Sequence, residues 1–152
     1  MRAAFDTSVL VAALVAPHPS HARALPWLEA CGGAVTGECS WHALAETWSV
    51  LTRLPIDPPI PPALASAAIE RVAARLVVRS AGGDEYRAAM RRCSERSVRS
   101  GALFDALHLA CAEASGADVL LTFNASDFER LSQEGPPRIV VPPDPPGIRL
   151  PG

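Results

Sequence analysis

The sequence predicts an α/β protein, an α/β/α sandwich in which helices cover both faces of a mainly parallel sheet. Short apolar runs alternate with longer segments of helical periodicity, which is the pattern of β–α–β units. The length of 152 residues suits one compact domain, and 49% hydrophobic residues are enough for a core. Aromatic residues make up only 5%, so this core must consist mainly of Ala, Val and Leu.

The apolar runs predict short strands. They cover residues 3–6, 34–36, 76–78, 119–122 and 138–141. Because each is short and followed by a helical segment or a turn, we expect most of them to lie parallel in one sheet.

The helical segments lie between these runs. We expect helices over residues 7–15, 21–31, 41–53, 64–75, 84–99 and 103–115, and a helical turn over 127–131. Thr7 or Ser8 offers a hydroxyl to cap the first helix. In 41–53 the i, i+3, i+4, i+7 spacing predicts one buried stripe, made of Trp41, Leu44, Ala45, Trp48 and Leu51. The proline-rich stretch 54–62 is a loop inside the domain, because neither side could fold alone.

Composition bounds the function. The net charge of -2 gives no overall attraction to nucleic acid, so a polyanion would need local basic clusters or bound cations. Cys31, Cys39, Cys93 and Cys111 form no CxxC pair and no zinc-site spacing. We therefore expect reduced thiols and a cytoplasmic protein. Asp6 and Thr7 interrupt the only stretch that resembles a signal peptide, and no apolar run approaches the ~18 residues of a membrane span.

Asp6 ends an apolar strand, at the position where parallel sheets form ligand sites. Helix capping by Asp6 is the alternative. Asp105 lies in a helical segment that is apolar on most faces. Burying an unpartnered carboxylate there costs several kcal/mol, so we expect a cation, an arginine or a cleft beside it. The alternative is a first-turn acid paired with the helix dipole after a Ser100 cap, although we place Asp105 past the first turn.

Glu46 and the loop after residue 122 are weaker candidates. Glu46 lies opposite the apolar stripe of its helix, with His42, Ser49 and Arg53, where a solvated face would look the same. Asn124 and Asp127 follow a strand, as Asp6 does, but Asp127 could simply cap the next helical turn.

Three acids in one place would require a cation. Two carboxylates ~4 Å apart repel by roughly 4 kcal/mol at an effective dielectric near 20. If Asp6, Glu46 and Asp105 converge, their oxygen ligands suit Mg²⁺ or Mn²⁺ rather than zinc. The chemistry of such an ion is phosphodiester hydrolysis.

Four segments in order resemble the PIN domains, and in particular the toxin ribonucleases of the VapC type. They are Phe5-Asp6-Thr7-Ser8-Val9-Leu10, the stretch His42 to Pro55 around Glu46, Phe104 to Ala110 around Asp105, and Leu120 to Phe128. The resemblance spans residues 1–141, taken as the nuclease domain, and leaves 142–152 as a proline-rich tail. It implies that Asp6, Glu46 and Asp105 are catalytic metal ligands and that Thr7 or Ser8 orients the ion or its water.

The chain departs from the family pattern at one position, and the resemblance also implies several partners. The family often has a fourth acid where this chain has Asn124, and Asp127 is the residue that could substitute as a ligand. This favours one firmly held ion over two. The family further implies an RNA substrate, a small antitoxin that binds near the acids, often with a cationic side chain inserted, and a homodimer.

RNA contacts are predicted more weakly. Arg92, Arg96 and Arg99 fall on one face of the expected helix 84–99 and could contact phosphates. A solvated face with local ion pairs is the alternative. We expect the four histidines to lie at the surface or behind the ligands, and no aromatic stacking surface is apparent from the sequence.

Two other functions stay open at this point. Asn124 also fits a non-catalytic PIN-like module that binds RNA or protein. A phosphatase of the haloacid-dehalogenase type would use Asp6 as a covalent nucleophile, but Ser8 stands where that class has a second Asp.

Overall fold

The computed structural model describes residues 1–143. The strands are β1 (Arg2–Phe5), β2 (Thr36–Ser40), β3 (Val77–Arg79), β4 (Val119–Leu121) and β5 (Arg138–Val140). The helices are α1 (Thr7–Leu14), α2 (His21–Glu29), α3 (Trp41–Arg53), α4 (Pro62–Arg75), α5 (Gly83–Glu95), α6 (Ala102–Ser115) and α7 (Ala125–Leu131). The predicted tail lies, apart from its first two residues, outside the described residues.

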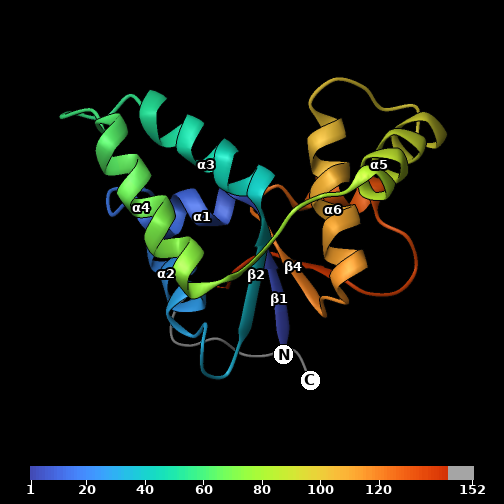
Figure 1. The fold of residues 1–152 in the computed structure, drawn as a ribbon, viewed down its shortest axis with the longest axis horizontal. Coiled ribbons are helices and arrows are strands. Elements are labelled where there is room, and N and C mark those ends of the chain that lie inside the picture. Colours follow the sequence, from blue (N-terminus) through green and yellow to red (C-terminus); the bar gives the residue numbers. More distant parts are fainter. Residues whose placement is uncertain (144–152) are drawn as a thin grey trace.

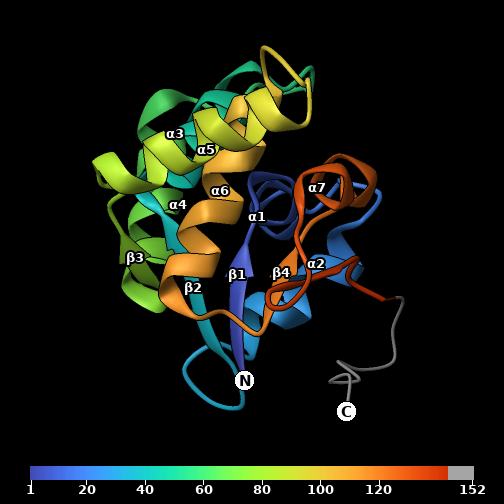
Figure 2. The same ribbon diagram turned by 90° about the vertical axis from the view of Figure 1, so that its right-hand side faces the viewer.

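The strands form one sheet in the order β3-β2-β1-β4-β5. Every neighbouring pair is parallel, with Ala3 of β1 opposite Gly37 of β2 and Val119 of β4. Helices α1 to α4 lie on one side of the sheet and α5 and α6 on the other (Figure 1). Seen from that second side, α5, α6 and α7 stand in front of the strands (Figure 2). The predicted α/β/α sandwich is therefore confirmed.

The two sides of β1 belong to different cores. Ala3 and Phe5 pack in a cluster with residues of α1 to α4, whereas Ala4 packs with residues of α5, α6 and α7. This is the alternation expected of a strand buried on both faces. The next residue along this alternation, Asp6, follows Ala4 toward the side of α6.

The second strand begins later than predicted. The sequence suggested residues 34–36, but β2 covers Thr36–Ser40 and contains Glu38, which is 3% exposed. A buried carboxylate is costly in a central strand, so the pattern did not indicate one. A Cβ atom at Gly37 would lie 2.4 Å from Cys31 Sγ and 2.5 Å from Leu76 Cδ2, so a larger residue here would displace these side chains.

Two helix predictions were also wrong in part. On α3, Trp41, Ala45 and Trp48 are exposed, and the buried stripe is Ala43, Leu44, Thr47 and Leu51. Small side chains allow close packing against neighbouring helices, while the Trp48 indole donates to Ser66 Oγ at 3.0 Å. The helix predicted to reach Arg99 ends at Glu95. The positive φ angles of Ser97 and Ser100 are incompatible with its continuation.

All four cysteines are free, and burial raises the pKa of Cys39 to about 12 and that of Cys31 to about 11. No helix within residues 1–143 is both long and apolar enough to cross a bilayer.

Candidate active site

The candidate site lies at the carboxyl edge of the sheet, where the chain reverses its direction of winding. From β1 the chain proceeds to β2 on one side, and β4 joins β1 on the other. Helix α1, after β1, packs on one face, whereas α7, after β4, packs on the opposite face. Parallel sheets form ligand-binding crevices at such switch points. Asp6 follows β1 and Thr122 follows β4, so both stand at this crevice.

Asp6 is almost fully buried and is held by hydroxyl groups. Its Oδ2 accepts hydrogen bonds from Ser8 Oγ at 2.6 Å and Thr122 Oγ1 at 2.8 Å, and from the Ser8 backbone N–H at 3.3 Å. It is also the N-cap of α1, so the capping alternative holds, and the predicted Thr7 or Ser8 cap was wrong. All these bonds reach Oδ2, which leaves Oδ1 as the oxygen that can meet a cation.

Glu46 projects from α3 toward α6. His108 Nε2 lies 2.6 Å from its Oε2, and Thr7 Oγ1 donates to the same oxygen at 3.0 Å. His42 Nε2 lies 3.7 Å from the other oxygen, Oε1. Burial would raise the pKa of Glu46, but the His108 and Thr7 contacts outweigh it and lower that pKa. Burial likewise opposes the charged form of His108, yet Glu46, Asp6 and Asp105 raise its pKa overall.

Asp105 has the environment of an acid without a partner. It lies in the first turn of α6, so its placement past the first turn was wrong, and the helix dipole favours its charge. Burial nevertheless raises its pKa to about 6, and the charges of Asp6, Asp127 and Glu46 act in the same direction, while His108 opposes them. No ion pair or hydrogen bond to its side chain exists within residues 1–143.

One cavity of about 570 Å³ brings the predicted acids together. Its lining includes Asp6, Thr7, Ser8, Glu46, Asp105 and Asn124. In the part of the chain that the structure describes, however, no three His, Cys, Asp or Glu side chains have the spacing of a metal centre. The acids share a cavity, and a shared ion would require their carboxylates to turn toward it.

The two residues predicted for the fourth ligand position, Asn124 and Asp127, line different cavities. Asn124 lines the main cavity and is the N-cap of α7, and its N–H donates to Thr122 Oγ1 at 2.9 Å. Asp127 lies in the first turn of α7 and lines a neighbouring pocket together with Asp105. Asp127 is therefore not the N-cap, and the predicted ligand with which it shares this pocket is Asp105.

The structure does not place the three arginines predicted to contact RNA on one helix face. Arg92 is 7% exposed, and its Nη2 lies 2.7 Å from Glu113 Oε2. Arg96 caps the end of α5 and donates to the Ser132 carbonyl at 3.1 Å, and Arg99 lies beyond the helix. The shared face was wrong because the helix is shorter than its polar pattern suggested.

Two of the histidines lie behind a predicted ligand, one of the two places expected for them, whereas Thr122 was not identified from the sequence. His108 and His42 flank Glu46, and His42 also stacks on Phe104, with ring centroids 4.9 Å apart. The i, i+4 spacing of His42 and Glu46 could have indicated the first contact. Only the fold brings His108 and Thr122 to the acids.

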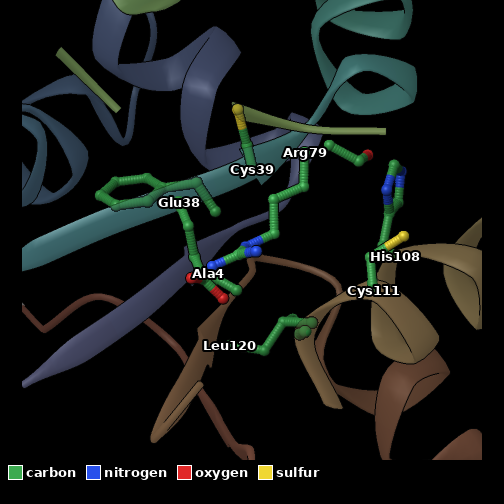
Figure 3. Close-up of a pocket in the computed structure, with 10 residues that line it drawn as sticks. Ala4, Glu38, Cys39, Arg79, His108, Cys111 and Leu120 are labelled. Carbon is green, nitrogen blue, oxygen red and sulfur yellow. Dashed lines mark ion pairs between the residues drawn. The ribbon is translucent and has the colours of Figure 1, made fainter. Parts of the chain in front are cut away.

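Glu38 is a further missed acid, and it lies behind the site. Figure 3 shows its carboxylate beside the Arg79 guanidinium, with His108 and Cys111 on the other side of a small cavity. Arg79 Nε and Arg2 Nε lie 3.9 and 4.0 Å from Glu38 Oε2, and Ser115 Oγ donates to Oε1. Its charge is thus compensated by the protein itself.

Fold and site together define a parallel-sheet protein with an acidic crevice at its switch point, and comparison with known proteins agrees. The PIN domain family model matches residues 3–134. Ribonuclease VapC27 of Mycobacterium tuberculosis H37Rv is 40% identical over 112 residues, which cover 72% of this chain and 77% of that protein. The chain belongs to the PIN domain family.

Solved structures show the same fold. Mycobacterium tuberculosis VapC20, described as a Sarcin-Ricin loop cleaving toxin, aligns with a TM-score of 0.68 and 22% identity over 84% of this chain and 93% of that one. A toxin–antitoxin complex from Klebsiella pneumoniae aligns with a TM-score of 0.65 and 20% identity over 93% and 98% of the two chains.

The donor chemistry fits the divalent ion that the family resemblance implies. Asp6, Glu46 and Asp105 offer only carboxylate oxygens, which suit Mg²⁺ or Mn²⁺. Burial raises the pKa of Asp105, and the charges of Asp6, Asp127 and Glu46 raise it further, so a cation beside these carboxylates would favour their charged forms.

Proposed function

We propose that the protein is a metal-dependent endoribonuclease and acts in the cytoplasm as the toxin of a toxin–antitoxin pair. The single observation that carries the proposal is the cavity shared by Asp6, Glu46 and Asp105, three acids that lie up to about a hundred residues apart in the sequence. The ribonuclease name of a relative at 40% identity supports the choice of RNA.

Each acid has a distinct part in the proposed site. Ser8 and Thr122 fix the Asp6 carboxylate and leave Oδ1 toward the ion. His108 and Thr7 hold Glu46 by Oε2, so Glu46 would present Oε1. Asp105, without such bonds, would be the acid that adjusts most when the ion arrives.

The ion would supply an activated water and would offset charge on the phosphate. The protein would hold the ion in position, because fixed carboxylates leave little freedom to the reacting groups. Thr7 and Ser8 would orient the acids rather than the ion itself, since their hydroxyls already donate to Glu46 and Asp6.

The direct test is cleavage of a labelled RNA by the purified chain with Mg²⁺ or Mn²⁺, compared with EDTA. Asp105→Asn should abolish cleavage and growth inhibition. Asp84→Asn is the matched control, because Asp84 is exposed on α5 and pairs with Arg87. Wild-type cleavage rates in Asp105→Asn would contradict the proposal.

We further propose a small antitoxin that presents a cationic side chain to the acidic cavity, and a homodimer of the nuclease chain. The toxin–antitoxin complex among the structural neighbours supports the first of these. Co-expression with a protein encoded directly upstream should suppress toxicity, and light scattering should give the mass of two chains.

A non-catalytic PIN-like module is the second candidate, favoured by Asn124 at the position where an acid is often found. In that case the chain would bind no Mn²⁺ at millimolar concentration and would cut no RNA. Titration with Mn²⁺ therefore separates the two candidates.

A further inference from the structure

The cavity that holds the acids is also lined by residues of a different chemistry. Besides the carboxylates, its lining includes one aromatic and two nitrogen-containing side chains, Phe123, His18 and Arg53. From the sequence we expected weak RNA contacts on the helix 84–99 and no aromatic stacking surface. The structure instead places an aromatic ring, an imidazole and a guanidinium in the same cavity as the acids.

Phe123 is connected to the catalytic acids through its backbone. Its N–H donates to Ser8 Oγ at 3.0 Å, and the same Ser8 hydroxyl donates to Asp6 Oδ2. This bond fixes the backbone of Phe123 relative to Asp6, and the side chain itself packs in part against the core cluster that includes residues of α1.

The ring is also supported from outside the cavity. The guanidinium carbon of Arg23 lies 5.3 Å from the centroid of Phe123, and Arg23 Nε donates to the Pro142 carbonyl at 2.8 Å. Arg23 is not part of the cavity lining, so the cavity meets the ring at a place that Arg23 does not occupy. Stacked aromatic rings bind unpaired nucleobases without requiring one particular sequence.

Arg53 and His18 supply the charge and the donor. Arg53 is exposed at the end of α3, and no carboxylate of residues 1–143 forms an ion pair with it. The Ser20 N–H donates to His18 Nδ1 at 3.1 Å, so the neutral ring carries its proton on Nε2 and can donate from there. A guanidinium and an N–H donor beside a metal site suit phosphate oxygens.

We propose that Phe123, Arg53 and His18 form a subsite for an unpaired nucleotide of the RNA, in which the base stacks on Phe123 and a phosphate contacts Arg53 and His18. The subsite rests on the proposed nuclease function and extends it, because it names single-stranded RNA as the substrate form. Paired bases are already stacked and cannot reach the ring.

The test measures binding rather than cleavage. The full chain carrying Asp105→Asn is the parent, and the probe is a short single-stranded RNA with a fluorescent label and a 2-aminopurine base. In this parent, Phe123→Leu should weaken binding about tenfold and remove the quenching of 2-aminopurine. Phe123→Tyr keeps the ring and should bind like the parent, which separates stacking from a folding defect.

Arg53→Gln should act through charge instead. Each phosphate contact to a single strand contributes about 0.7 to the slope of the logarithm of affinity against that of salt concentration. The Arg53→Gln slope should fall by about this amount, whereas Phe123→Leu should leave it unchanged. Arg87→Gln and Tyr86→Leu, both exposed on α5, are the matched controls and should bind like the parent.

The outcomes are separable from those of the nuclease test. Phe123→Leu binding as tightly as Tyr86→Leu would overturn the subsite even if the wild type cuts RNA. A parent that binds no single-stranded RNA would also overturn it. Intact stacking in a chain whose wild type never cuts RNA would support the subsite and contradict the nuclease.

Discussion

Glu38 lies on β2 and Asp6 directly follows the neighbouring strand β1; each is 3% exposed, and the protein compensates their charges in opposite ways. Glu38 has Arg2 and Arg79 about 4 Å away and a hydroxyl donor. Asp6 has only hydroxyls and one backbone N–H, and it faces a cavity with further acids. Burial alone therefore does not mark a functional carboxylate. An acid becomes available to a ligand where the fold gives it hydrogen bonds but no counter-charge.

The largest expected difference between the two acids is in catalysis. Asp6→Asn should lower kcat about 100- to 1000-fold, the range for loss of one charge-stabilising group. Glu38→Gln should leave kcat per folded molecule unchanged, because its carboxylate is turned toward the arginines. Steady-state RNA cleavage, corrected for the folded fraction, measures both. Equal losses in the two variants would remove the distinction.

The second difference is in stability. Loss of the Glu38 charge should destabilise the folded protein, whereas loss of the charge of a cavity acid, Asp105, should stabilise it. Glu38→Gln should lower the free energy of unfolding by about 1–3 kcal/mol, below the 3–5 kcal/mol of a fully buried pair. The reduction is expected because Arg2 and Arg79 are 41% and 46% exposed and regain water. Asp105→Asn should instead raise the free energy of unfolding at neutral pH by relieving repulsion. Urea titration of both variants would show whether the signs differ.

The pH dependence of stability should also report the missing counter-charge of Asp105. Asp105 holds its proton more tightly in the folded chain, since its pKa rises from 3.8 to about 6. Its stabilising contribution is therefore complete below pH 3.8 and is lost as the pH rises through about 6. The raised pKa of His108 acts in the same direction above 6.5. The lowered pKa of Glu46 acts in the opposite direction, with stability lost as the pH falls below 4.5.

Thermal unfolding across this range, without metal, should show the Asp105 contribution as a decline between pH 3.8 and about 6. Asp105→Asn should lack that decline and should keep the one above pH 6.5. A variant whose profile superimposes on that of the wild type would mean that Asp105 is an ordinary surface acid.

The smallest effect concerns the support of Asp6. Thr122→Val removes the hydrogen bond to Asp6 Oδ2, which should lower stability by about 1 kcal/mol and cleavage about tenfold. Thr47→Val is the control, since Thr47 is equally buried but donates to the Ala43 carbonyl within α3. It should lower stability by a similar amount while cleavage per folded molecule stays unchanged.

The sequence was sufficient for the elements of the fold and for the acids at strand ends. Periodicity located α3 at its observed bounds, and Asp6 was identified because it ends an apolar strand. β2 was misplaced because its buried Glu38 depends on Arg2 and Arg79. No local pattern reports a counter-charge supplied by two other strands.

Within the site, the contacts that support the acids were beyond the sequence. His108 meets Glu46 across 62 positions, and Thr122 meets Asp6 across 116. The prediction of an arginine face was wrong because the charge pattern does not show where the helix ends. Arg92, Arg96 and Arg99 share a face only if α5 continues past Ser97.

The central claim is that Asp6, Glu46 and Asp105 together create a place for one divalent ion. Calorimetric titration of the full chain with Mn²⁺ tests it most directly, with Asp105→Asn and Glu38→Gln titrated in parallel. We predict one site in the wild type and in Glu38→Gln, and loss of that site in Asp105→Asn. Absence of binding in the wild type, or equal affinity in Asp105→Asn, would contradict the account.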